Sequence, residues 1–149
     1  SIKALGIDYH FMSSAELQTN LTFEPGVTCL FNSGTRLWVT ATGAITANGT
    51  PSEKITFSGI FSSPGAWNGI ELASASPENS IDYAIISFGG NSSGRDANIY
   101  MFNSSKLTLT NSTISDSQTW GIFLAAGSPE LTESSNTFSN NASGDIGGI

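Results

Sequence analysis

The stretch LTLTNSTISD at residues 107–116 recurs as LTESSNTFSN at residues 131–140. Within each copy, apolar and polar residues alternate over short runs that are bounded by Asn, Ser or Asp, which is typical of β-strands. A close repeat at such a short separation indicates a chain built from stacked copies of one small unit. The two copies therefore predict a repetitive all-β protein.

Similar segments begin further upstream. The first series starts at Leu21, Leu37, Ile55, Ile81, Leu107 and Leu131. A second series follows in phase and starts at Val27, Ile45, Ile70, Ile99, Ile122 and Ile146. The later repeats add a third short element, which contains Ile86, Ile114 and Phe138. Because such short strands bury their apolar faces only against neighbouring coils, we expect a parallel β-solenoid of about six coils.

The breaks between these segments have the composition of tight turns. Pro25-Gly26, Asn48-Gly49 and Pro64-Gly65 all fall between predicted strands. In the last two coils we expect the amides of corner asparagines to bond turn carbonyls, at Asn111, Asn136, Asn140 and Asn141. The one candidate helical turn is Ser13–Leu17, and we expect residues 1–20 to form an N-terminal capping segment.

Composition restricts the classes of partner. The formal net charge of −7 disfavours binding to nucleic acids, anionic membranes and acidic polysaccharides. No stretch approaches the ~20 apolar residues that a transmembrane helix needs. Ser, Thr and Asn supply 51 of the 149 residues, and the aromatic content favours folding over disorder. The single cysteine, Cys29, excludes an intrachain disulfide, and its alternation with Val27 and Phe31 predicts a buried thiol.

Three segments carry a family resemblance. They are LTFEPGVT at residues 21–28, PGAWNGI at residues 64–70 and IDYAIISFGG at residues 81–90. They resemble the right-handed parallel β-helix repeats of bacterial secreted and surface proteins, within the pectate-lyase-like superfold. The resemblance covers residues 21–149 and implies a right-handed, single-stranded parallel β-helix with an extracellular or cell-surface location. Because the sequence stops directly after a strand start, we expect it to be excised from a longer chain.

Members of this superfold that cleave uronate polysaccharides resemble one another in placing several carboxylates, with an Arg or Lys close by, on neighbouring coils. The expected outward column beside the first series contains one acid and consists of Thr22, Trp38, Thr56, Asp82, Thr108 and Thr132. Arg95 and Asp96, in the loop Asn91–Asn98, could approach Asp82 or Asp116 in the folded stack, but we interpret them as a surface ion pair. His10 has no visible nucleophilic partner. We therefore predict no catalytic residue, no metal site and no cofactor.

Surface recognition is the remaining interpretation. The outward column of the second series reads Glu71, Tyr100, Phe123 and Gly147, so two aromatic rings should lie on adjacent coils. Such rings can bind the apolar faces of sugars or the surface of a protein partner. We expect Tyr100 and Phe123 to form a ligand-binding surface that Trp38 and Trp120 extend.

Three functions follow from these observations. The preferred one is a non-catalytic extracellular module that presents a rigid polar and aromatic face to carbohydrate or to a surface protein. The second is a fragment of a polysaccharide lyase or glycoside hydrolase whose acids lie outside this segment. The third is an ice-binding β-solenoid, since four of the six positions in the expected outward column are Thr, although Trp38 and Asp82 interrupt it. Six Asn-x-Ser/Thr sequons would matter only in a eukaryotic secretory host, and they lie at Asn20, Asn48, Asn91, Asn103, Asn111 and Asn141.

Overall fold

The computed structural model describes residues 1–149 and contains 17 β-strands in three parallel sheets. Sheet 1 consists of β1 (Asp8–Phe11), β4 (Thr28–Phe31), β7 (Ile55–Gly59), β10 (Ala84–Ser87), β13 (Thr113–Ser115) and β16 (Thr137–Ser139). Sheet 2 consists of β2 (Ala15–Leu17), β5 (Arg36–Val39), β8 (Gly69–Leu72), β11 (Ala97–Met101), β14 (Trp120–Leu124) and β17 (Gly144–Gly148). Sheet 3 consists of β3 (Asn20–Phe23), β6 (Ala44–Asn48), β9 (Ser80–Asp82), β12 (Lys106–Thr110) and β15 (Glu130–Ser134).

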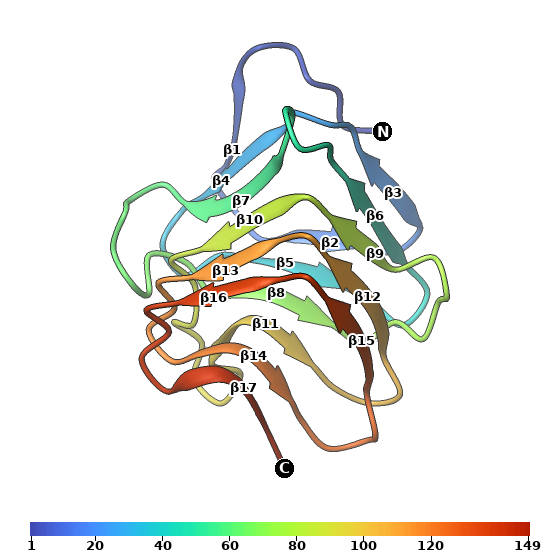
Figure 1. Cartoon of the computed structure of the whole chain (residues 1–149), viewed down its shortest axis with the longest axis vertical. Helices are drawn as coiled ribbons and strands as arrows, with labels where there is room; N and C mark the ends of the chain where they lie inside the picture. Colours follow the sequence, from blue (N-terminus) through green and yellow to red (C-terminus); the bar gives the residue numbers. More distant parts are fainter.

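The chain visits the three sheets in rotation, so strands that are three places apart in the sequence pair in parallel. Figure 1 shows the coils stacked along the long axis of the molecule, from the N-terminus near the top to the C-terminus at the bottom. This arrangement confirms the predicted all-β parallel solenoid of about six coils.

The core is one continuous cluster of 23 buried residues along this axis. Within sheet 1, equivalent inward positions pile up as a column of Tyr9, Cys29, Phe57, Ile86, Ile114 and Phe138. In the first coils the ring of Phe31 stacks against Phe11 and Trp67, with centroid distances of 4.6 and 4.4 Å. Each fully buried side chain of this size contributes about 1.5–3 kcal/mol, so neighbouring coils stabilise one another.

A buried amide anchors one corner. Asn98 is fully buried, and its Oδ1 accepts a hydrogen bond from the backbone N of Gly89 at 2.7 Å. Its Nδ2 donates to the carbonyl of Ser115 at 2.8 Å. Since unpaired backbone groups at a buried corner would be costly, this amide holds the base of the loop between β10 and β11 in place.

The corner asparagines of the last coils divide into two kinds. Asn136 and Asn141 bond backbone groups of the preceding coil, and this confirms the prediction for these two residues. Asn111 and Asn140 instead donate to carboxylates, those of Asp82 and Asp116. The prediction that all four bond turn carbonyls is therefore wrong for Asn111 and Asn140.

The predicted assignment of strands to sheets is wrong for the first coils. Three strands make a coil from the start of the chain, so Leu21, Leu37 and Ile55 lie on sheets 3, 2 and 1 instead of sharing one sheet. From β9 onward the predicted first series does follow sheet 3. The predicted third element is confirmed there too, since it forms β10, β13 and β16 of sheet 1. Alternating runs of three to five residues look alike on every face, and so the spacing alone could not assign the early ones to sheets.

The outward column that was predicted beside the first series is also wrong. Trp38 belongs to sheet 2 and Thr56 to sheet 1, while Asp82 is in register with Thr110 rather than with Thr108. One outward column of sheet 3 carries a hydroxyl on every coil and consists of Thr22, Thr46, Ser80, Thr108 and Thr132.

The first residues of the chain take part in the solenoid. Strands β1 and β2 lie within the expected capping segment, residues 1–20, and pair with β4 and β5. Ile2 forms an isolated parallel bridge with Phe23. The candidate helical turn at Ser13–Leu17 is wrong, because Ala15–Leu17 is extended and pairs with sheet 2.

The thiol of Cys29 is buried, as predicted. It has no exposed surface, and burial raises its pKa from an ordinary value of 9.0 to about 12. Below pH 9 the thiol keeps its proton in both the folded and the unfolded state, so this group leaves stability unchanged there. Above pH 9 only the unfolded state releases the proton. Stability is then lost as the pH rises from 9 toward 12.

We expect the unfolding free energy to fall by up to about 1.4 kcal/mol per pH unit above the thiol's ordinary pKa, beyond the changes seen in Cys29→Ala. Urea unfolding of both proteins over the alkaline range measures this difference. Other titrating groups are common to the two proteins, so parallel curves would contradict a buried, titrating thiol.

Candidate functional site

A single outward column runs along the whole of sheet 2. Its register partners on successive coils are Glu16, Trp38, Glu71, Tyr100, Phe123 and Gly147. The predicted order of its last four members is confirmed. Trp38, which the sequence analysis placed in a different column, also belongs here.

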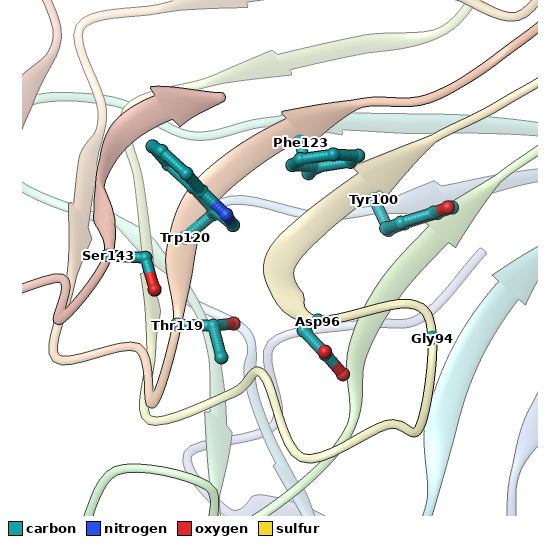
Figure 2. A pocket seen from close by; sticks show the side chains of 7 residues that line it. All are labelled: Gly94, Asp96, Tyr100, Thr119, Trp120, Phe123 and Ser143. Atoms are coloured by element: carbon teal, nitrogen blue, oxygen red, sulfur yellow. The ribbon is translucent and has the colours of Figure 1, made fainter. Parts of the chain in front are cut away.

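A groove lies over the C-terminal half of this column, with a volume of about 320 Å³. Its lining residues come from β11, β14 and the loops beside them, and they are Gly94, Asp96, Tyr100, Thr119, Trp120, Phe123 and Ser143. Figure 2 shows the three aromatic rings gathered along one side of the groove and the side chains of Asp96 and Thr119 on the other. The structure thus brings together three of the four predicted ligand-binding residues.

The rings of Tyr100 and Phe123 are stacked on each other. Their centroids are 5.6 Å apart and their planes differ by 14°. Because the column places them on adjacent coils, each ring covers part of the other ring's face (Figure 2). These two residues form a rigid apolar wall, because the ring faces that meet in the stack are not free to contact a ligand.

Trp120 differs from this pair because its indole rests on backbone. A Cβ atom at Gly147 would lie 2.6 Å from the indole Cδ2, and one at Gly144 would lie 2.8 Å from Cζ3. The two glycines therefore form a seat for one face of the ring. The remainder of the indole is part exposed and lines the groove, 6.1 Å from Phe123 between centroids.

The groove continues beyond the aromatic rings. A neighbouring depression of about 260 Å³ shares Asp96 and Thr119 with it and is otherwise lined by Gly90, Asn91, Ser92, Ser93 and Gln118. The two depressions form one two-lobed groove, with an aromatic lobe and a polar lobe. The hydroxyl Oγ1 of Thr119, where the lobes meet, is buried and has no hydrogen-bond partner.

Trp38 lies outside the groove. Two coils separate it from Phe123, and Glu71 and Tyr100 occupy the positions between them. Its ring is covered by the guanidinium of Arg36, whose Cζ lies 4.6 Å from the ring centroid. The hypothesis that Trp38 belongs to the same binding surface is therefore not supported by its position.

Glu71 forms a buried ion cluster between the groove and Trp38. Its Oε2 accepts from Nη1 of Arg36 at 2.7 Å and from Nη1 of Arg95 at 2.8 Å. The carboxylate is fully buried on the outward face because the two arginines cover it, and Arg95 also lies over the ring of Phe102. A buried carboxylate needs such pairing, so this cluster clamps three coils together.

This cluster overturns the expected ion pair between Arg95 and Asp96. Arg95 turns to Glu71, and Asp96 takes part in none of the three ion pairs of the chain. Asp82 accepts hydrogen bonds from Thr110 and Asn111, away from the groove. No group of three or more His, Cys, Asp or Glu side chains is arranged to hold a metal ion.

Sequence reasoning missed the polar half of the site. Asp96, Thr119 and Ser143 come from corners of successive coils, and no alternation pattern marks corner residues as neighbours. The near-repeat of residues 107–116 and 131–140 contains a usable signal. It would have placed Thr119 and Ser143 at equivalent corners, since both lie three residues after the matched segments end.

One family model matches most of the chain. The family is described as right handed beta helix region, and its model matches residues 13–149. No curated protein and no solved structure matches the chain. No helix of the structure is long and apolar enough to span a membrane.

The seat of Trp120 can be tested by Gly147→Ala. We expect the added methyl group to displace the indole, because it would meet the ring at 2.6 Å, and the tryptophan emission spectrum should change. The matched control is the same substitution in a Trp120→Phe protein, where the spectrum should stay unchanged. An equal spectral change in both backgrounds would mean that Trp38 or Trp67 reports the substitution, which would contradict the proposed seat.

Proposed function

Since the chain belongs to the right-handed β-helix family, whose coils hold side chains in fixed columns, we propose that it is a non-catalytic extracellular module that binds carbohydrate in the two-lobed groove over sheet 2. The observation that carries this proposal is the indole of Trp120, seated on two glycines and bordered by polar side chains.

The chemistry of sugars fits this arrangement. A pyranose ring has an apolar face of C–H groups and an edge of hydroxyl groups. The indole of Trp120 and the wall of Tyr100 and Phe123 offer apolar contact, while Asp96 and the exposed hydroxyl of Ser143 offer hydrogen-bond acceptors and a donor. The polar lobe adds a volume of about 260 Å³ that is lined by Asn, Gln and Ser side chains. The groove therefore has room for more than one sugar unit.

The number of carboxylates in the groove favours a binding role over hydrolysis. Glycoside hydrolysis generally uses two carboxylates on opposite sides of the scissile bond. The residues that line both lobes include one carboxylate, that of Asp96. The stacked coils are rigid, so the groove is formed before a ligand arrives. Such a preformed site loses little conformational entropy when the ligand binds.

Replacing Trp120 by Ala should weaken glycan binding by about tenfold or more, because the lost contact is worth about 1.4 kcal/mol or more. The ligand is first identified on an array of neutral, acidic and basic glycans, and affinity is then measured by calorimetry. The matched control is Phe61→Ala, which removes a 65% exposed ring from a loop outside the groove.

Two results would oppose the proposal. Equal affinities of the Trp120→Ala and wild-type proteins would exclude the groove as the binding site. Release of reducing ends or unsaturated products from any glycan would replace the binding module with the lyase or hydrolase alternative.

Adsorption to ice is a second candidate function, and the corrected register of sheet 3 favours it. One outward column carries hydroxyls on all five strands, while Asp82 lies in the neighbouring outward column of the same face. Strands about 4.8 Å apart would space these hydroxyls evenly, and an even row can hydrogen-bond a row of water molecules. Thr46 and Ser80 are part buried, which shortens the freely exposed row.

Thermal hysteresis of the purified protein measures this second candidate. If the column adsorbs to ice, Thr108→Tyr should abolish the hysteresis, since a bulky ring would hold the face away from a flat surface. Ser62→Tyr, at an exposed loop position, serves as the control. No hysteresis in the wild-type protein would eliminate this function.

A further inference from the structure

We propose that the groove recognises a glycan with free amino groups, so that an ammonium group of the ligand pairs with Asp96 while the sugar ring contacts Trp120. This inference rests on the proposed carbohydrate binding and names its ligand class. The position of Asp96, its lack of a cationic partner and the charge of its surroundings all support it.

Asp96 lies where the two lobes of the groove meet. It is the one charged residue among those that line either lobe, and it lines both. A ligand that extends from the aromatic lobe into the polar lobe therefore passes Asp96. The lining residues include no Lys, Arg or His that could compete with a ligand cation.

The cation and the amide nearest to Asp96 in the sequence, those of Arg95 and Asn98, bond other groups. Arg95, its neighbour in sequence, donates to Glu71 at 2.8 Å. The amide of Asn98 is fully buried and bonds the backbone of Gly89 and Ser115. Asp96 is part exposed and lines both lobes, and a charge-assisted bond from an ammonium group to its carboxylate is stronger than a neutral hydrogen bond.

An ammonium group fits this place better than a second carboxylate or a sulfate group would. An anion beside Asp96 would be repelled by it, and the net charge of −7 adds to that repulsion. Arg36 and Arg95 both pair with Glu71, and so their charges are partly neutralised. The π-face of an indole adds attraction for a cation that lies within about 6 Å of it.

The test compares two ligands of equal length, a glucosamine hexamer and an N-acetylglucosamine hexamer, by titration calorimetry with the whole chain. The acetylated hexamer has no ammonium groups but keeps the same backbone. We expect the wild-type protein to bind the glucosamine hexamer about tenfold or more tightly than the acetylated one, because a charge-assisted bond replaces a neutral contact.

The decisive variant is Asp96→Asn, which should remove this preference and give similar affinities for both hexamers. Its matched control is Glu16→Gln, which removes one negative charge from an exposed position of the same column, far from the groove. The control should keep the preference if Asp96 acts directly. Loss of preference in both variants would mean that net charge alone attracts the ligand, and this would overturn the inference.

The remaining outcomes separate the inference from the function on which it rests. If both hexamers bind wild-type protein equally and Trp120→Ala weakens both, carbohydrate binding holds and the inferred ligand class is wrong. If the preference persists in Asp96→Asn, the inference also fails. If neither hexamer binds but another glycan does so through Trp120, the proposed function stands and the amino-glycan inference is overturned.

Discussion

Every feature of this molecule depends on the in-register parallel pairing of successive coils. Because each strand bonds to its equivalent in the next coil, residues at the same position lie directly above one another, about 4.8 Å apart. On the inside this produces continuous apolar columns, such as the one that joins Cys29, Phe57 and Ile86. On the outside the same constraint places Tyr100 over Phe123 and forms the wall of the groove.

The polar bonds at the corners connect this stack to the site. The loop that carries Asp96 leaves sheet 1 after β10 and returns to the stack at β11, where Asn98 is buried. The Asn98 amide bonds the next coil as well as its own loop, through Ser115 and Gly89. The position of the groove carboxylate is thus set by the stability of the corner two residues away, not by contacts of the carboxylate itself.

Charge is distributed locally in a way that the total of −7 does not reveal. Two of the five basic residues, Arg36 and Arg95, are used to cover the buried carboxylate of Glu71. A buried acid on a strand requires this pairing, and it leaves Asp96 without a cation of its own. A structural cluster that spans three coils therefore determines the electrostatics of the groove beside it.

The sequence by itself determined the fold class, the approximate number of coils, the burial of Cys29 and the column of Glu71, Tyr100, Phe123 and Gly147. These follow from alternation and from near-repeats, which are local properties of the chain. The tertiary structure alone decided that the first coils also have three strands, that Trp38 shares the outward column of sheet 2, and that Arg95 turns to Glu71. It also brought Asp96 and Trp120 to the same groove, because corners of different lengths set which loop residues meet, and no periodic pattern encodes that meeting.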